Sequence, residues 1–263
     1  MIKYNNNSIN DWYFYTSDIV KVYRNNAVRY QKIYSGSTAT WIAKLTLNDG
    51  SSVTIEGTGN LTRNETSAYS ASAVSVELGP YCTGVGISAF TRFYGITSID
   101  IPSNVTSIGS TSFYFCTGLT SVNIPNTVTS IGTAVFQGCA GALSITWPDT
   151  LTNITDSAIR DCTALTAFTI PNTVTRVGVR AFSGDRSLTN ITIPSGVTAI
   201  GEYAFYACSG LTSITVEAAT PPTLGSKVFD NTDCPIYVPA ASVETYKAAR
   251  GWSNYASRIQ AIQ

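Results

Sequence analysis

The stretch Leu119-Thr-Ser-Val-Asn-Ile-Pro-Asn-Thr-Val-Thr-Ser-Ile-Gly132, followed by Ala134-Val-Phe136 and Cys139, decides the fold, because the chain repeats its pattern at a fixed step. The step is 23 residues (125 − 102 = 23), and five prolines keep it: Pro102, Pro125, Pro148, Pro171 and Pro194. A fixed period in the twenties is the signature of a solenoid, in which each unit buries its apolar side only against its neighbours.

Three other columns follow the prolines at the same step. The glycine column has Thr155 as its exception, the phenylalanine column has Ile159, and the cysteine column is broken by Asp185. Their regular members are Gly109, Gly132, Gly178 and Gly201; Phe113, Phe136, Phe182 and Phe205; and Cys116, Cys139, Cys162 and Cys208. Because Ala142 also replaces leucine in the unit with Thr155 and Ile159, we expect a looser or kinked turn there, without a domain break.

These units resemble the BspA-like bacterial leucine-rich repeats, whose pattern is L-x-x-I-x-I-P-x-x-V-x-x-I-G-x-x-A-F-x-x-C. Clear repeats cover about half of the chain, and degenerate units flank them. The resemblance implies a right-handed leucine-rich-repeat solenoid. It also implies a role in adhesion or protein binding, as in surface proteins of gut and oral bacteria.

Within one repeat, alternation predicts that Val122 and Ile124 point inward while Ser121 and Asn123 point outward. Pro125 ends the strand because it lacks the N–H that a ladder requires. A second short strand follows at 128–131, and residues 134–139 are expected to form one helical or 3-10 turn. The fold class is therefore a β-rich repeat protein with short helical or 3-10 turns.

The rest of the chain divides into flanking elements. We predict an N-terminal β-hairpin attachment element at 1–35, an N-terminal solenoid cap at 41–80, the solenoid at 81–233 and a helical C-terminal cap at 234–263. The hairpin is expected to pair 19–23 with 27–33, and Ser35-Gly-Ser-Thr38 reads as a linker. A second hairpin pairs 43–47 with 52–56 around Asn48-Asp49-Gly50.

Helix signals lie in both predicted caps. Thr62-Arg-Asn-Glu65 has the spacing of a capping box, which predicts a short helix from 63 to about 71. Near the C-terminus a helix is expected over 241–250, ended by Gly251. Trp252, Tyr255 and Ile259 should then cover the open end of the core.

The N-terminal segment is rich in aromatic side chains, and two interpretations of them stay open. They form a miniature core, or they form an attachment patch, because Tyr and Trp are enriched at binding hot spots. The opening of the chain also resembles a leader found on proteins of gut Bacteroidales and their phages, which implies an attachment module. The candidate attachment residues are Trp12, Tyr13, Tyr15, Tyr23 and Tyr30.

Composition excludes several classes of function. The 263 residues carry 16 basic and 16 acidic side chains without a basic stripe, so no nucleic-acid partner is expected. There is no histidine, which removes Ser-His-Asp and Cys-His catalysis and histidine-ligated metals. The carboxylates are scattered and no phosphate-binding glycine loop occurs. We therefore expect no catalytic, cofactor or metal site, and no enzyme.

The six cysteines are interpreted as buried thiols. Neighbouring cysteines in one column point the same way about 4.8 Å apart, which suits a disulfide poorly. A thiolate metal site is disfavoured because no C-x-x-C pair exists. Cys82 and Cys234 lie out of register near opposite ends of the solenoid, so both are expected to be free.

Stacked strands would place polar residues in two outward rows. A solvated β face is one interpretation, and a broad recognition face is the other, since solenoids bind along such surfaces. The candidate partner-binding residues are Asp100, Ser121, Asn123, Thr146, Thr169, Asn190 and Thr192.

Two functional hypotheses follow. In the first, the chain is an adhesion or recognition protein that docks a protein or glycan partner. In the second, it is a phage virion component, anchored by residues 1–35 through virion proteins or self-association; an enzyme is a distant third. No signal peptide is visible after Met1 and no apolar run approaches the roughly 20 residues of a membrane span. The expected location is the virion or the bacterial cell surface.

Overall fold

The structure is a computed structural model that describes residues 12–16, 19–24, 27–31 and 40–263. It separates into two compact units, Met1–Thr40 and Trp41–Gln263. Each unit is described by itself below. The side chains of residues 1–39 are outside the description, as are the backbone segments 1–11, 17–18, 25–26 and 32–39.

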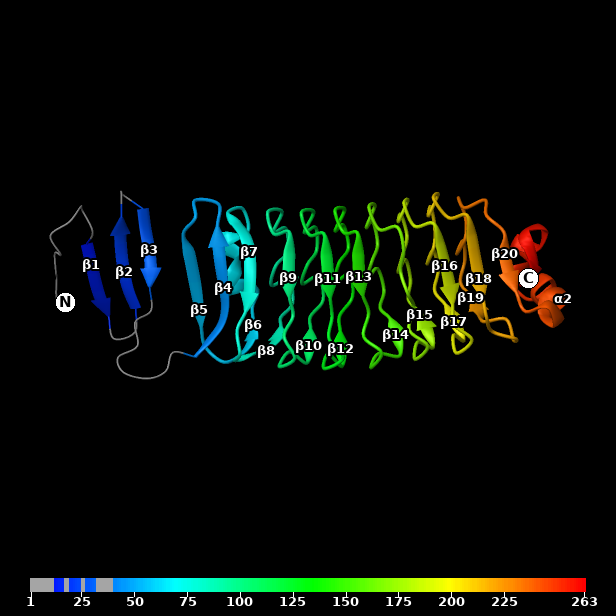
Figure 1. Ribbon diagram of the computed structural model, residues 1–263, viewed down its shortest axis with the longest axis horizontal. Helices are drawn as coiled ribbons and strands as arrows, with labels where there is room; N and C mark the ends of the chain where they lie inside the picture. Colours follow the sequence, from blue (N-terminus) through cyan, green and yellow to red (C-terminus); the bar gives the residue numbers. More distant parts are fainter. Residues whose placement is uncertain (1–11, 17–18, 25–26, 32–39) are drawn as a thin grey trace. The chain divides into compact units, whose positions relative to one another are not determined.

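The first unit contains a three-stranded antiparallel sheet in the order β1-β2-β3, with β1 at Trp12–Thr16, β2 at Ile19–Arg24 and β3 at Ala27–Gln31. The predicted hairpin is confirmed, because Arg24 pairs with Ala27 and Val20 with Gln31. β1 adds a third strand, which was not predicted from the sequence (Figure 1). The extra strand fits the fact that a two-stranded hairpin is marginally stable alone.

The second unit begins with the predicted hairpin of β4 (Trp41–Leu47) and β5 (Ser52–Glu56), turned through Gly50 at φ +79°. β6 (Gly59–Leu61) leads to α1 (Arg63–Thr66), a 3-10 turn η1 (Ser67–Tyr69) and β7 (Ala73–Leu78). The capping box is present, with the Thr62 N–H donating to Glu65 Oε2 at 2.6 Å.

The helix predicted over 63–71 is shorter than expected. It leaves α geometry after Thr66, and the 3-10 turn that follows ends at Tyr69. Hydroxyls of this segment bind backbone carbonyls, as Ser70 does at Ser67 O, and such bonds compete with helix continuation.

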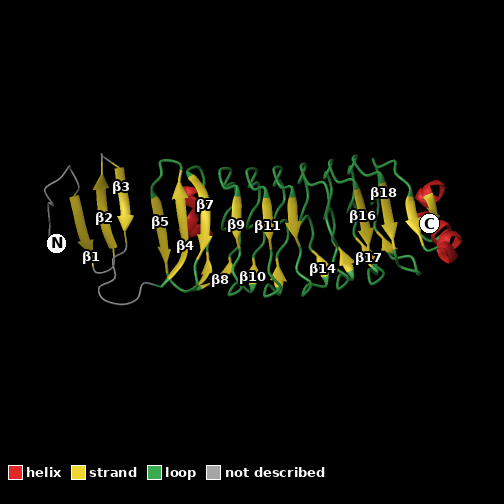
Figure 2. Cartoon of the chain, in the orientation of Figure 1, coloured by secondary structure: helices red, strands yellow, loops and turns green. Residues whose placement is uncertain are grey.

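The repeats stack in parallel register, and all but the one that contains residues 167–169 contribute one strand to each of two sides of the coil (Figure 2). The register is the sequence period itself, since Ser121 pairs with Ser98 and with Ser144. On the first side the sheets run β13-β11-β9-β7-β4-β5 and β16-β18-β20-β21. The strands of these two sheets not yet described are β9 (Ser98–Asp100), β11 (Ser121–Asn123), β13 (Ser144–Thr146), β16 (Asn190–Ile193), β18 (Ser213–Val216), β20 (Ile236–Val238) and β21 (Ile259–Ala261).

The second side carries shorter strands in the orders β12-β10-β8-β6 and β14-β15-β17-β19. Most of them are two residues long, because the proline turn and the following corner leave little extended chain. Their bounds are β8 (Cys82–Val85), β10 (Ser107–Ile108), β12 (Ser130–Ile131), β14 (Asn153–Ile154), β15 (Arg176–Val177), β17 (Ala199–Ile200) and β19 (Thr223–Leu224).

The third side consists of turns, where helical or 3-10 turns were expected. Bonds of the 3-10 type are present, as from Gln137 N to Ala134 O, but they do not extend into a helix. The reason is Ala134, whose φ of +52° lies in the left-handed region. Two columns share this geometry at the repeat period: residues 88, 111, 134, 157, 180 and 203, and residues 92, 115, 138, 161, 184 and 207.

The core is a stack of equivalent side chains. The rings of Phe113 and Phe136 lie parallel at 5.3 Å between centroids, and those of Phe182 and Phe205 at 5.1 Å. Offset stacking of aromatic rings adds about 0.5–1.5 kcal/mol per pair beyond area burial. Val122 and Ile124 are buried, as predicted, and so are Leu119, Val128 and Ile131 of the same repeat.

The C-terminal end closes this core with aromatic side chains. η2 (Ala240–Ser242) continues into α2 (Val243–Ala248), and η3 (Trp252–Arg258) follows Gly251. Tyr246 and Trp252 are buried, and each polar tip reaches a carbonyl: Tyr246 O–H donates to Ala218 O at 2.7 Å, and Trp252 Nε1 donates to Pro222 O at 2.8 Å. The expected covering role of Trp252, Tyr255 and Ile259 is confirmed. The exact boundaries of the predicted segments stay predictions.

Candidate recognition surface

The seven candidate partner-binding residues are all solvent-exposed and lie on the first side of the solenoid. Ladder pairing aligns Asp100, Asn123 and Thr146 in one row, with Ser121 in the neighbouring row. Further along, Asn190 and Thr192 stand in register with Ser213 and Thr215. Thr169 continues the row in sequence but belongs to no strand. We call this exposed side the sheet face, defined by β9, β11, β13, residues 167–169, β16 and β18.

The sheet face is interrupted after Thr146. β13 ends one sheet and β16 begins the next, and residues 167–169 join only β16, through an isolated bridge from Ala167 to Asn190. The second side breaks one turn earlier, between β12 and β14. Threonine hydroxyls bond Thr129 to Thr106 O and Thr175 to Thr152 O, while across residues 40–263 no such bond joins Thr152 to Thr129. Both parallel ladders are therefore broken around the coil that contains Trp147.

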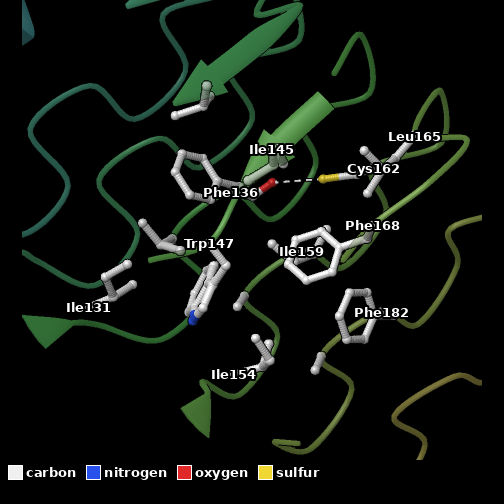
Figure 3. Packing of buried hydrophobic residues seen from close by; sticks show 14 of the residues in the cluster. Ile131, Phe136, Ile145, Trp147, Ile154, Ile159, Cys162, Leu165, Phe168 and Phe182 are labelled. Atoms are coloured by element: carbon white, nitrogen blue, oxygen red, sulfur yellow. Dashed lines mark hydrogen bonds between the residues drawn. The ribbon is translucent and has the colours of Figure 1, made fainter. Parts of the chain in front are cut away.

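The break coincides with a change in where the large core side chains come from: the turn side of this coil loses a ring and the strand side gains two. Ile159 leaves the phenylalanine column short of a ring, while Phe168 and Trp147 occupy positions that hold isoleucine or valine in other repeats. Figure 3 shows both large side chains directed into the cluster around Ile159. The Phe168 ring packs edge-on to Phe182 at 5.0 Å and lies 6.4 Å from the Trp147 ring.

The third side remains continuous through the break. Ala134 N donates to Asp156 O at 2.8 Å, Phe136 N to Ala158 O at 2.9 Å and Gly138 N to Arg160 O at 2.8 Å. The same register links every pair of turns along this side. Residues 41–263 stay one compact unit, so the expectation of a loosened turn without a domain break is confirmed.

A cleft of about 540 Å³ opens on the sheet face at the break. Three candidate residues line it, Asn123, Thr146 and Thr169, together with the exposed Asp149 and Ala167. Its base is formed by Trp147 and Phe168, which are 3% and 7% exposed. Asp100, Ser121, Asn190 and Thr192 lie outside the cleft lining.

The cleft was missed by the sequence analysis, although the sequence carried a signal. Trp147, Asp149, Ala167 and Phe168 each depart from the residue types that occupy the same repeat positions elsewhere. The departures from the repeat pattern that the sequence analysis used, at Ala142, Thr155 and Ile159, lie outside the cleft lining. The surface consequence required knowing that the ladders open where the core residues change size.

The thiols of the structure are protected rather than reactive. All six cysteines are free and buried, as expected. The S–H of Cys116 donates to Phe90 O at 2.9 Å, and Cys139, Cys162 and Cys208 repeat the contact at equivalent carbonyls. Burial raises the pKa of Cys116 to about 12, so its thiolate is disfavoured at neutral pH.

Asp185 takes the place of cysteine in this column and is fully buried. Its Oδ1 accepts the Cys162 N–H at 2.8 Å, while Oδ2 has no hydrogen-bond partner within residues 40–263. Burial raises the pKa of the Asp185 carboxyl well above its usual value. The Asp185 carboxyl lies inside the cysteine column and outside the cleft lining, so Asp185 takes the place of a cysteine in the core and does not belong to the cleft.

Across 40–263 and the described strands before it, no group of three or more His, Cys, Asp or Glu side chains is placed to hold a metal ion. Among the same residues, no helix is both long and apolar enough to cross a membrane. The candidate attachment residues Trp12, Tyr13, Tyr15, Tyr23 and Tyr30 belong to strands β1, β2 and β3, but their side chains lie outside the described part of the chain.

Comparison with protein families identifies the repeats. The profile described as BspA type leucine rich repeat region matches residues 51–166 and 135–245, with six copies of the repeat unit. These matches together span well over half of the chain. The chain belongs to the BspA-type leucine-rich repeat family. The predicted leucine-rich-repeat fold and the family resemblance are thereby confirmed.

Solved structures of bacterial leucine-rich repeat proteins are similar to this BspA-type chain. A leucine-rich repeat protein of T. pallidum is 20% identical, with 75% of this chain and 90% of that chain covered and a TM-score of 0.43. One from Bacteroides ovatus is 18% identical, with coverages of 89% and 71% and a TM-score of 0.45. The pneumococcal vaccine antigen PcpA is 16% identical, with coverages of 91% and 71% and a TM-score of 0.39. A comparison with curated proteins returned no match.

Family membership sets the general role. Leucine-rich repeat proteins of this type generally bind other proteins, are generally non-enzymatic and often stand at the cell surface. A protein-binding or adhesive role is the coarse function that follows.

Proposed function

We propose that this BspA-type chain is a non-enzymatic recognition protein that presents its sheet face to a protein partner at the bacterial cell surface. The observation that carries the proposal is the sheet face itself, where ladder pairing keeps short polar side chains in register across several repeats. A rigid, shallow surface of this kind binds an extended partner at little cost in side-chain entropy, because Ser, Thr and Asn have few rotamers.

The partner-binding residues proposed on this face are Asp100, Ser121, Asn123, Thr146, Thr169, Asn190 and Thr192. Their exposure supports this, since solenoids offer such surfaces to partners. A glycan is the alternative partner on the same face. No catalytic or cofactor role is proposed for any residue.

A charge-insertion pair tests the proposal. Asn190→Arg places a long cation on the sheet face, and Ser130→Arg makes a matched insertion at an exposed position of β12 on the second side. Fluorescently labelled protein is applied to intact bacterial and epithelial cells and read by flow cytometry. We expect Asn190→Arg to weaken binding at least about threefold, which corresponds to less than 1 kcal/mol, and Ser130→Arg to bind like the unsubstituted protein. Equal binding by the two variants would contradict the proposed face.

The second candidate is a phage virion component anchored by its N-terminal unit. Supporting it are the compactness of Met1–Thr40 as a separate unit and the resemblance of the leader to phage-associated proteins. Antibody labelling of purified virions in negative stain tests the location directly. A sizing-column comparison of the full chain with its Tyr13→Ser/Tyr15→Ser variant tests self-association, and unlabelled virions would remove this candidate.

A further inference from the structure

We propose that the cleft beside Trp147 receives one lysine or arginine side chain from an extended segment of the protein partner. The inference rests on the proposed recognition function and adds the chemistry by which one part of the sheet face selects its ligand. Four features of the cleft support it: its size, its polar groups, its apolar base and its departures from the repeat pattern.

The size of the cleft suits a side chain and a short piece of backbone. Its volume of about 540 Å³ lies within the range of small-ligand pockets, roughly 300–1,000 Å³. Away from the break the strands of the sheet face are paired, as β9 is with β11 and β16 is with β18. The opening of the ladders between β13 and residues 167–169 creates the cleft.

The polar groups of the lining favour a cation. Asp149 contributes an exposed carboxylate that, within residues 40–263, forms no ion pair and no side-chain hydrogen bond. Asn123, Thr146 and Thr169 add side-chain oxygens, while no Lys or Arg belongs to the lining. A guest ammonium or guanidinium group would find acceptors on several sides, and the low-dielectric base strengthens its attraction to the carboxylate.

A hydrogen bond from the backbone of Asp149 to a side chain of the preceding coil fixes the main chain at this residue. Its N–H donates to Asn126 Oδ1 at 3.0 Å, which ties the proline turn of this coil to the preceding one. This bond holds the backbone of Asp149 at the rim, and the carboxylate takes no part in it.

The apolar base favours a long side chain over a bare cation. Trp147 and Phe168 lie beneath the polar rim, with Pro125 and Pro171 at its sides. Lysine and arginine bury their methylene stems against such surface while the charged end stays in contact with polar groups.

Two of the departures from the repeat pattern are not explained by packing. Trp147 and Phe168 compensate for the missing ring at Ile159, but Asp149 and Ala167 are exposed and fill no core. Their equivalents elsewhere are Ser or Asn: Ser103, Asn126, Asn172 and Ser195 for the first, and Ser98, Ser121, Ser144, Asn190 and Ser213 for the second. The change at Asp149 adds a carboxylate to the lining, and the change at Ala167 replaces a polar side chain by a methyl group; both changes suit a guest with a charged end and an apolar stem.

The electrostatics of the neighbouring sheet face point the same way. Glu77 and Asp100 are paired in register on β7 and β9, in the row that leads to Asn123 at the cleft. Lys44 stands beside Glu77 at the far end of this row. Between Lys44 and the cleft the charged groups of the row are therefore acidic, which favours approach of a basic segment.

A displayed library of random linear heptapeptides, selected on the immobilised full-length protein, tests the proposal. We expect the selected peptides to share a Lys or Arg. Their synthetic versions are then measured by fluorescence anisotropy on the unsubstituted protein, Asp149→Asn, Ala167→Trp and the control Asp233→Asn, an exposed carboxylate outside the lining. Binding should weaken about three- to tenfold in Asp149→Asn, fall further when a large side chain fills the cleft in Ala167→Trp, and stay unchanged in Asp233→Asn.

Other results would overturn the proposal. Selected peptides without a basic residue would contradict the proposed lysine or arginine guest. Undiminished binding by Asp149→Asn would contradict it as well. An array of neutral glycans bound by Asp149→Asn but not by Ala167→Trp would assign the cleft to sugars. If cell binding through the sheet face persists while no peptide binds, only the cleft inference fails; if cell binding is also indifferent to Asn190→Arg, the proposed function fails with it. Thermal melting of each variant by circular dichroism checks that it is folded.

Discussion

The coils around Phe113 and Phe136 and the coil around Trp147 solve the same packing problem in different ways. In the regular coils, phenylalanines of one column stack in parallel and the strands above them pair on both sides. In the Trp147 coil the aromatic volume has moved from that column to the strand side, and the ladders on two sides open while the turn side stays bonded. In this solenoid the turn side therefore holds successive coils together, and the strand ladders tolerate an interruption.

The largest expected effect concerns the regular stack. Phe136→Ala removes a fully buried ring that stacks on Phe113 at 5.3 Å, and should lower the free energy of unfolding by about 3–5 kcal/mol. Denaturant unfolding followed by circular dichroism measures it. Ile159→Ala in the irregular coil should cost less, about 2–4 kcal/mol, because a smaller side chain is lost. A larger loss at Ile159 would show that the irregular coil is the more critical part of the core.

The second prediction concerns Asp185, the irregular member of the cysteine column. Because its pKa is raised in the folded state, folded protein binds the proton more tightly than unfolded protein does. The stabilising effect of this proton uptake is complete below the ordinary value of 3.8 and is lost as the pH rises toward the higher folded-state pKa.

Asp185→Cys, which restores the column, should therefore gain stability over the unsubstituted protein as the pH rises above about 4, at up to roughly 1.4 kcal/mol per pH unit. Urea unfolding of both proteins between pH 4 and 7 gives the difference, and Asp233→Asn is the surface control. A difference that is constant over this range would show that Asp185 ionises in the folded protein as it does in water.

The third prediction tests the exchange of volume between the two sides. Ile159→Phe should restore the ring column but collide with Phe168, at a cost of about 1–3 kcal/mol. Adding Phe168→Val makes room on the strand side and should recover most of the loss. The double-mutant cycle measures this coupling. Simple additivity of the two changes would mean that Phe168 does not fill the space left at Ile159.

The smallest effect concerns the turn side that both kinds of coil share. Gly138 has a φ of +77°, and a Cβ there would lie 2.9 Å from the Phe115 ring, so Gly138→Ala should destabilise by about 1–2 kcal/mol. Ala134 has a φ of +52°, which glycine adopts more easily than alanine, so Ala134→Gly should stabilise the folded protein by up to about 1 kcal/mol. Thermal melting of the pair compares them. A stabilising Gly138→Ala would contradict the assigned backbone geometry.

Much of the fold was readable from residue types at fixed spacing. In one repeat, the residue types predict a strand end at Pro125, a corner at Gly132 and a core ring at Phe136. The inward residues of that repeat are buried as expected. The turn predicted at 134–139 is present as single hydrogen bonds of the 3-10 type. The left-handed φ values at Ala134 and Phe115 were not predicted, because they carry no composition signal: only Gly138 and Gly184 in these columns are glycine. The exposure of the candidate face followed from alternation, whereas the cleft could not be predicted from local pattern.

The sequence alone determined the period, the register and the outward rows, because 23-residue spacing and alternation dictate which side chains stack when identical coils are piled up. Only the tertiary structure decided where those coils stop pairing. That outcome depends on how Trp147, Ile159 and Phe168, which are far from adjacent in the repeat, share one volume in three dimensions. Packing density is a property of the assembled core, so the cleft that results is invisible until the core is assembled.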